Sequence, residues 1–398
     1  MSILYVIYLF FLGYIAFTVL YITAFAIAGR IGRADDIQTV RLPNIFRKIA
    51  VLIPAYKEDA VIVESVLVNL KQSYPTDRFD LIVIADSLQP TTLAELATLP
   101  IKVLEVSFEV STVTKAINEA LNWLPEGRYD IALVSDADNH MAPDFLMRVN
   151  TAFEHGWQAV QGHRVAKNTN TSVAVLDAIS EEINNHIFRK GSRALGLSSS
   201  IIGSGMAIDF KLMKAAMTDL HTIGGYDKEL EKKIVLSGVK IGYLEQAFIY
   251  DEKVANRAVF EKQRTRWIAA QWQFLKFYSS VGISELLKGR IASAFKFIQA
   301  FVLPRVMLLG LLAVCTCVGL LSSDVLLWGL PLVSLITLCI SLVISVPFYL
   351  WKRVTLRELL LIPALMLNFA KAIFNMRKAF KSFIHTPHQT PIPVDKIK

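Results

Sequence analysis

The sequence predicts a mixed α/β domain flanked on both sides by transmembrane helices. Short β-rich runs alternate with helical stretches between about residues 48 and 251, the pattern of a largely parallel sheet. Three runs outside that core carry no charged residue: Met1–Gly29, Val306–Ser323 and Val325–Trp351. Each approaches or exceeds the roughly 18–20 residues that a helix needs to cross a bilayer. The hydrophobic share, 54% of 398 residues, agrees with this division.

The first uncharged run favours a retained membrane anchor, predicted here as residues 1–29. It has no basic segment before it, and its apolar core is longer than the ~7–15 residues of a signal peptide. Small residues near Ala24, Ala26 and Ala28 keep a cleaved signal peptide open as the alternative.

The placement of Lys and Arg predicts the orientation in the membrane. Arg30 and Arg33 follow the first run, Lys352 and Arg353 follow the third, and the loop near Asp324 contains neither residue type. Basic residues collect on the cytoplasmic side of bilayers. We therefore expect an inner or plasma membrane protein with a cytoplasmic middle domain and C-terminus. The net charge is +8, and the basic residues lie beside the apolar runs and do not form a basic stripe. Nucleic acid is therefore not an expected partner.

The alternating region, 30–254, supplies six expected strands and three expected helices. Each strand is a short apolar or β-branched run, and each helix shows helical spacing of its apolar residues. The expected strands are Ile49–Pro54, Leu81–Asp86, Ile101–Val106, Ile131–Asp136, Gln158–Gly162 and Ile241–Tyr250; the expected helices are Glu58–Gln72, Thr112–Leu124 and Pro143–Glu154. Ligand-binding residues are expected just beyond the carboxyl ends of the strands.

The C-terminal part divides into membrane-associated segments. Residues 255–304 are expected to form amphipathic and interfacial helices, with Ala292–Val302 lying in the membrane surface. Residues 305–351 are expected to hold two transmembrane helices. Residues 352–398 are expected to form an in-plane or re-entrant helix and a basic cytoplasmic tail, because Leu359–Ala370 is short for a span.

An acidic pair, Asp136 and Asp138, follows the apolar run Ile131–Val134. Two carboxylates at the tip of a buried strand suit Mg²⁺ or Mn²⁺, which bridge to substrate phosphates. The alternative is that the pair lies in a solvated turn and has no metal-binding role. No cysteine pair or histidine cluster offers a disulfide framework, a zinc site or a nucleophilic triad.

A second pattern places Gln263, Arg266 and Trp267 on one helical face, at i, i+3 and i+4. An amide, a guanidinium and an indole so arranged can bind oxygen-rich ligands, clamp a diphosphate and stack on a sugar ring. A Trp and an Arg beside a membrane can alternatively serve only as an interfacial anchor.

Together these segments resemble the membrane-bound family-2 glycosyltransferases, the group of cellulose, chitin and hyaluronan synthases that carries the Q-x-x-R-W signature. The resemblance covers roughly Ala50 to Phe274 and implies a GT-A-like fold with N- and C-terminal transmembrane helices. It also implies a metal, Mg²⁺ or Mn²⁺, held by Asp138 with Asp136 on the diphosphate of a nucleotide-sugar donor, most typically a UDP-sugar.

The resemblance assigns further residues. Donor or nucleotide contacts are implied for Ala55, Glu58, Asp86, Lys115, Asp136, Gln263 and Arg266, and acceptor contacts for Ser204, Gly205 and Trp267. This chain departs from the family at Lys57, where Asn is more common, which weakens the expected base or ribose contacts there. Three plainer interpretations remain open: Glu58 as a helix-start residue, Lys115 as a solvated side chain, and the glycine loop, Ile202–Ala207, as a simple turn.

The general base implied by the family motif is Asp227. Glu229 and Leu230 match that motif, whereas Tyr226 replaces the usual Glu, so Glu229 and Glu231 stay open as alternatives. A carboxylate near the acceptor hydroxyl is needed to remove its proton during attack.

The expected activity is inverting transfer of a sugar, with processive polysaccharide synthesis favoured. The partners would be a saccharide or lipid acceptor, the bilayer, and an accessory subunit or a second copy of the chain. The alternatives are transfer of one sugar to a lipid or lipid-linked acceptor and, from another class, a catalytically inactive nucleotide-sugar sensor. A transporter is disfavoured because the ionisable motifs lie outside the apolar runs.

Overall fold

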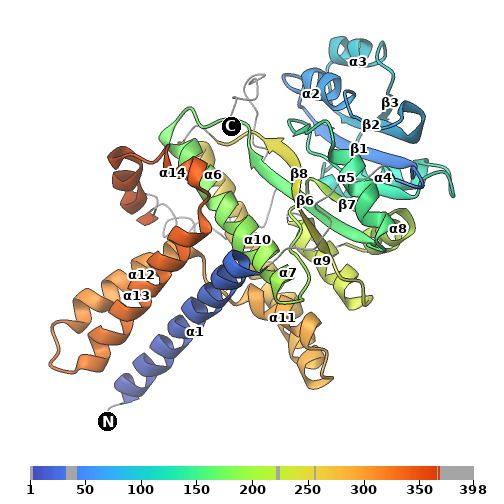
Figure 1. Ribbon diagram of the computed structural model, residues 1–398. Helices are drawn as coiled ribbons and strands as arrows, with labels where there is room; N and C mark the ends of the chain where they lie inside the picture. Colours follow the sequence, from blue (N-terminus) through green and yellow to red (C-terminus); the bar gives the residue numbers. More distant parts are fainter. Residues whose placement is uncertain (1–2, 33–42, 221–224, 255–256, 365, 368–398) are drawn as a thin grey trace.

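The computed structural model describes residues 3–32, 43–220, 225–254, 257–364 and 366–367. Its centre is an eight-stranded sheet in the order β3-β2-β1-β4-β7-β6-β8-β5 (Figure 1). The strands are β1 (Ile49–Tyr56), β2 (Phe79–Asp86), β3 (Lys102–Val106), β4 (Ile131–Val134), β5 (His140–Met141), β6 (Ala159–Ala166), β7 (Met206–Asp209) and β8 (Gly242–Asp251).

Alternation along the buried strands sends side chains into two separate cores. Ile49, Val51 and Ile53 of β1 face one core, and Ala50 and Leu52 face the other. Both cores are apolar, so β1 is buried on both faces, as central strands of parallel sheets are. The first core is covered by α2 (Ile62–Asn69) and α5 (Phe145–Glu154); the second is covered by α4 (Val113–Trp123), α8 (Phe210–Met217) and α9 (Tyr226–Leu236). The result is a three-layer α/β/α domain.

The expected α/β class is confirmed, and the six expected strands are present with shifted ends. The sheet is more mixed than expected, because β7 runs antiparallel to β4 and β6, and β5 runs antiparallel to β8. Both strands were missed. They are only four and two residues long, too short to show a period of their own.

The remaining described helices surround this domain or extend from it. They are α1 (Ile3–Ile31), α3 (Pro90–Leu96), α6 (Ser172–Asn184), α7 (Ser192–Ala194), α10 (Arg257–Leu287), α11 (Ile291–Ala300), α12 (Arg305–Gly319), α13 (Val325–Ser345) and α14 (Phe348–Trp351), with a 3₁₀ turn η1 (Thr76–Arg78) and a π-helical segment η2 (Asn185–Gly191).

Helices α1, α12 and α13 lie side by side and project away from the sheet (Figure 1). Their shared core contains Ile15, Leu308 and Leu338. Near one end the Tyr5 hydroxyl donates to Asp324 Oδ2 at 2.8 Å, which joins the start of α1 to the turn before α13. These ends therefore lie on the same side of the bundle.

Two of the helices, α1 over Tyr5–Ile31 and α13, are long and apolar enough to cross a membrane. The expected span Val306–Ser323 is shorter than predicted, since α12 ends at Gly319 and has 15 residues. It reaches spanning length only together with α11, from which it is bent by 64°. Helix α11 coincides with the expected interfacial helix. Residues 356–364 are helical, and most of the expected basic tail lies outside the described residues.

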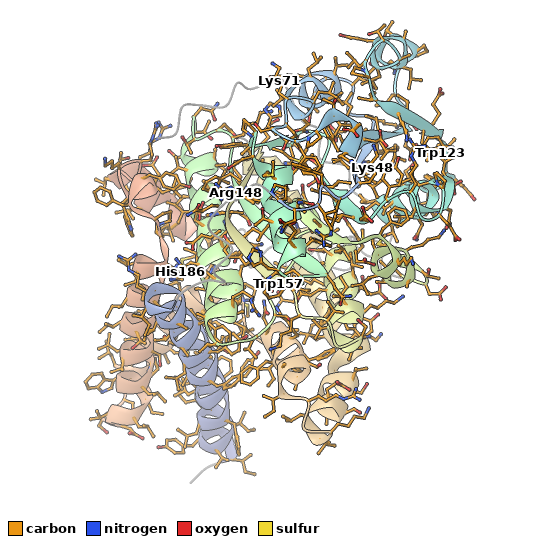
Figure 2. The ribbon with its side chains drawn as sticks, turned by 45° about the vertical axis from the view of Figure 1, so that its right-hand side comes forward. Lys48, Lys71, Trp123, Arg148, Trp157 and His186 are labelled. Atoms are coloured by element: carbon orange, nitrogen blue, oxygen red, sulfur yellow. The ribbon has the colours of Figure 1, made fainter. Side chains whose placement is uncertain are left out.

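The bundle is fixed to the sheet domain through η2. His186 of η2 donates from Nε2 to the Ala26 carbonyl oxygen of α1 at 2.9 Å, and Figure 2 shows this residue where the two elements meet. A Cβ at Gly191 would clash with the Phe25 carbonyl oxygen, so only glycine permits this approach of the two backbones. The apolar helices and the sheet thus form one packed unit.

Candidate active site

A cavity of about 550 Å³ lies beyond the carboxyl ends of β1 and β4, where it meets the membrane-flanking helices. One wall comes from the sheet, through Pro54, Tyr56 and the acidic pair. The opposite wall comes from α6, α9, α10 and α11 and ends at the start of α12. Six of the residues assigned a role from the sequence line it, as does Glu231, the alternative base; the six are Glu58, Asp136, Asp138, Asp227, Gln263 and Trp267. The acidic pair and Trp267, separated by 129 positions or more, therefore share one cavity.

The acidic pair follows β4 directly. Asp138 is 2% exposed, and its Oδ2 accepts a hydrogen bond from the Glu252 amide at 3.0 Å, just past the end of β8. Asp136 is less buried, and its backbone amide donates to Ser204 Oγ at 3.0 Å. Among the described residues no third acidic, His or Cys side chain completes a metal site. The two hard carboxylates fit a divalent ion whose remaining ligands are phosphate oxygens and water.

The glycine loop supports the acidic pair from behind. The Ser204 hydroxyl donates to Asn139 Oδ1 at 2.5 Å, and Gly205 has φ of 67°, which favours glycine. Ser204 is fully buried, and neither residue lines the cavity; Ile202 and Gly203 do. Acceptor contacts for Ser204 and Gly205 stay a prediction, and the geometry gives both a supporting role.

The expected nucleotide side lies at the ends of β1 and β2. Ala55 and Asp86 are buried there, and neither lines the cavity. The neighbouring Lys57 and Ser87 both have positive φ, 56° and 58°. Such backbone strain in two non-glycine residues is typical of functional sites. Lys57 directly follows β1 and Ser87 directly follows β2, so the backbone turns sharply after both strands at the same edge of the sheet.

The Lys115 side chain does not line the cavity. Its Nζ donates to the Val110 carbonyl oxygen at 2.8 Å, and its exposed side chain lies outside the cavity lining. The preceding residues, Val113 and Thr114, line the cavity instead. A phosphate contact by Lys115 would therefore require the side chain to turn.

Asp227 lies in the first turn of α9, after Gly225, whose φ is 74°. Burial and the charge of Glu231 raise the pKa of Asp227, while Lys228 and Arg164 oppose the shift. A raised pKa suits a carboxylate that must accept a proton.

The other two carboxylates of α9 have strong partners. Glu229 is 2% exposed and accepts a 2.5 Å hydrogen bond from the Tyr278 hydroxyl. Glu231 accepts from the Ile201 amide at 2.8 Å and forms an ion pair with Lys296 at 3.2 Å. These contacts favour Asp227 over both as the base.

Helix α10 brings Gln263 and Trp267 to the cavity. The Arg266 side chain lies outside the described part of the chain. Gln271, two turns after Gln263, donates to the carbonyl oxygens of Ala300 and Val302 at 3.0 and 3.2 Å. The helix carrying the Q-x-x-R-W pattern is thereby fixed to the link between α11 and α12.

Sequence reasoning missed a buried charge network in the cavity wall. Arg164 lies 2.9 Å from Glu181 and 3.7 Å from Asp251, Arg189 lies 3.1 Å from Glu181, and Lys253 lies 2.6 Å from Asp251. All five side chains line the cavity. Only paired charges are tolerated at such burial, so the network holds β6, α6, η2 and β8 together. Arg164 lies two residues after Gly162, where the expected strand ended. A charged residue just beyond a predicted strand was the one signal of this network that the sequence offered.

Comparisons with known proteins agree with this architecture. The sequence model of a family described as glycosyltransferase like family 2 matches residues 46–270. That range is more than half of the chain, and it contains the acidic pair, Asp227 and the Q-x-x-R-W residues.

Curated relatives match over shorter segments. The chain is 32% identical over 139 residues to glucans biosynthesis glucosyltransferase H of Rhodopseudomonas palustris strain TIE-1, covering 31% of this chain and 19% of that protein. It is 26% identical over 246 residues to the probable glycosyltransferase YdaM of Bacillus subtilis strain 168, covering 58% and 57%. The chain thus spans about a fifth of the first relative and somewhat over half of the second.

Two solved structures are similar to this chain at low sequence identity. A mannosyltransferase from Pyrobaculum calidifontis, in complex with GDP-Man and Mn²⁺, has a TM-score of 0.47 and 15% identity over 83% of this chain and 99% of its own. S. aureus TarS has a TM-score of 0.41 and 18% identity over 84% of this chain and 55% of its own.

Proposed function

Because the chain belongs to the glycosyltransferase-like family 2, we propose that it transfers a sugar from a nucleotide-sugar donor to an acceptor at a membrane surface. The observation that carries this proposal is the single cavity shared by the acidic pair, Asp227 and Trp267. We propose a UDP-sugar as donor, a growing saccharide as acceptor and processive synthesis as the mode. Mg²⁺ or Mn²⁺ is the proposed cofactor.

The proposed reaction is a single displacement with inversion at the anomeric carbon. Asp227 takes the proton of the acceptor hydroxyl, whose oxygen forms the new bond to that carbon from the face opposite the nucleotide. The bond to the diphosphate breaks and its electron pair leaves with the nucleotide. A metal held by Asp136 and Asp138 would stabilise the charge of this leaving group.

Other residues bind and orient the substrates. Trp267 offers an indole face to the acceptor sugar, and Gln263 offers an amide within the same cavity. Arg266 and Lys115 are proposed to supply positive charge to the diphosphate, and Ala55, Glu58 and Asp86 to line the nucleotide. Holding both substrates in one orientation lowers the barrier by converting a bimolecular step into a unimolecular one.

The proposed orientation places the sheet domain in the cytoplasm, at the inner or plasma membrane. Arg30 lies in the last turn of α1 and Lys352 follows α14, whereas the turn at Asp324 lies at the opposite end of the bundle, beside Tyr5. Basic residues thus collect at the end of the bundle that meets the sheet domain, as they do on cytoplasmic sides. An accessory subunit or a second copy would supply further helices for polymer passage.

A second candidate is transfer of one sugar to a lipid or lipid-linked acceptor. The cavity extends to Pro304, Arg305 and Val306 at the start of α12, so an acceptor anchored in the bilayer could enter from that side. Sizing the product separates the candidates, because a processive enzyme yields long chains and this alternative yields a short lipid-linked product.

The test is sugar transfer by purified membranes supplied with radiolabelled UDP-sugars or GDP-mannose and with Mg²⁺ or Mn²⁺. We expect one donor to be used, and chelation of the metal to abolish transfer. Asp138→Ala should lose at least about 100-fold in rate, because the leaving-group charge is no longer stabilised. Asp77→Ala, with a side chain 77% exposed outside the cavity, should retain the rate. Full activity of Asp138→Ala would contradict the proposal and favour a transporter or sensor.

A further inference from the structure

Lys296 is a buried cation that the proposed reaction does not use. It lies on α11, directly before the apolar helix α12, and is 8% exposed at the cavity wall. Its Nζ lies 3.2 Å from Glu231 Oε1 and donates to Ser200 Oγ at 3.0 Å. A buried lysine is costly unless it is paired, so the ion pair with Glu231 is the reason that this position tolerates a charge.

Glu231 connects three parts of the site. Its Oε1 pairs with Lys296 of α11, and its Oε2 accepts from the Ile201 amide, in the loop that leads to Ser204. It also lies four residues after Asp227 on α9, and residues at i and i+4 are neighbours on one helical face. One carboxylate therefore joins the candidate base, the glycine loop and a membrane-flanking helix.

We propose that Lys296 is a positioning residue that neutralises Glu231 and thereby keeps Asp227 competent to accept a proton. This inference rests on the proposed function of Asp227. Without Lys296, the charge of Glu231, one turn from Asp227 on the same cavity wall, would lose its ion-pair partner. Like charges at that spacing favour protonation of one of them, and a protonated Asp227 is no longer a base.

Other charged and titratable groups lie near Asp227 and Lys296, and they also influence the pH dependence of the transfer rate. The groups around Asp227, Glu231 and Lys296 are Lys228 on α9, Arg164 on β6, Arg189 on η2, Asp136 after β4 and the phenols of Tyr226 and of Tyr21 on α1. Arg164 and Arg189 are already engaged by Glu181, at 2.9 and 3.1 Å. Among the described residues Lys296 is the salt-bridge partner of Glu231, so its removal changes the charge at Glu231 most directly.

The test is the pH dependence of the transfer rate for wild type, Lys296→Met, Glu231→Gln and the double variant. We expect Lys296→Met to move the acidic limb of the profile upward by on the order of one pH unit. The double variant should return to within a few tenths of the wild-type profile, since it removes both charges together, and Glu231→Gln should not move the limb upward. Lys296→Arg should restore the wild-type profile.

A matched control removes an ion pair elsewhere. Lys190→Met breaks the 2.6 Å pair with Glu245 outside the cavity and should leave the acidic limb in place. The inference is overturned if Lys296→Met lowers the rate equally at every pH, or if the double variant stays shifted. Failure of the proposed base looks different: Asp227→Asn would then keep its activity, whatever the Lys296 variants do.

Discussion

The hydroxyl of Ser204 donates to Asn139 Oδ1 at 2.5 Å and accepts from the Asp136 amide at 3.0 Å. These two bonds join the glycine loop to the segment that carries the acidic pair. Because the two segments are separated by about 65 residues in the chain, the position of the proposed metal-binding carboxylates depends on a contact that no local pattern encodes.

Ser204→Ala should therefore weaken both the fold and the site. It leaves buried polar groups of Asn139 and Asp136 without this partner, at a cost of about 1–3 kcal/mol in the free energy of unfolding. We expect a lower unfolding temperature in detergent and a lower transfer rate. Ser237→Ala, which loses a single bond to the Ile234 carbonyl oxygen, should cost less and keep the rate. Equal losses in the two variants would contradict this role for Ser204.

Gly205→Ala should destabilise the protein for two separable reasons. The φ of 67° costs a non-glycine residue about 1–2 kcal/mol. The new Cβ would also lie 2.7 Å from Ile249 Cγ2. Gly127→Ala isolates the first cost, since its φ is 73° and nothing lies within 4 Å of the added carbon. The difference between the two unfolding free energies measures the steric part, and a difference near zero would exclude the predicted clash.

The parts of the fold that follow local periodicity could be predicted from the sequence. The runs at β1, β2, β4 and β8 are apolar and bounded by polar residues, and each appears as a strand within two residues of its expected ends. The short strand β7 could not be found this way. It exists because β4 and β6 supply hydrogen-bond partners on both sides, which is tertiary context.

The site residues also divide into those that local sequence patterns indicate and those that depend on tertiary contacts. Residues that follow strands or occupy one helical face, such as Asp136, Asp138 and Trp267, line the common cavity, while their roles stay predictions. Arg164 was missed because β6 continues past Gly162 through a register shift that brings polar residues into the sheet. The burial of Lys296 was equally hidden, since it depends on how α11 packs against α9.

Asp227→Asn should lower the transfer rate by about 10²–10⁴-fold, because the amide cannot take the acceptor proton. Single-turnover rates at saturating donor report this loss directly. Asp219→Asn, an exposed residue outside the cavity, should keep the wild-type rate. Activity of Asp227→Asn near the wild-type value would shift the assignment to Glu231.

The raised pKa of Asp227 also predicts a pH dependence of activity. The base is available only when it is ionised, so wild-type activity should fall with decreasing pH above the range of an ordinary Asp, about 4. The contribution of Asp227 to the free energy of unfolding changes with pH in the opposite direction to its contribution to activity. The folded protein holds this proton more tightly than the unfolded chain, so the stabilisation is complete below about pH 4 and is lost as pH rises through the folded pKa. A rate that stays constant down to pH 4 would contradict the assignment.

His163 connects the sheet to the short helix α14 through Glu182. Its Nε2 lies 3.0 Å from Glu182 Oε2, and the other oxygen of Glu182 accepts from the Tyr349 hydroxyl of α14 at 2.9 Å. Burial by itself would lower the pKa of His163, but the charge of Glu182 and the bonds to Glu182 and Glu245 outweigh it, so the pKa is raised. The protonated imidazole therefore stabilises this junction.

A histidine with a raised pKa contributes stability that is complete below its unfolded pKa, about 6.5, and is lost as pH rises through the folded value. We expect His163→Gln to lower the unfolding temperature at pH 6 and to differ less from wild type at pH 9.5, since the stabilisation by the charged imidazole is lost as pH rises. His155→Gln, which removes a bond to the Thr151 carbonyl oxygen at the end of α5, should show the same small difference at both pH values. Since Glu182 keeps its bond to Tyr349 in His163→Gln, α14 stays attached at high pH. An equal loss at both pH values would mean that His163 acts through packing with Tyr243 and Phe248 and not through its charge.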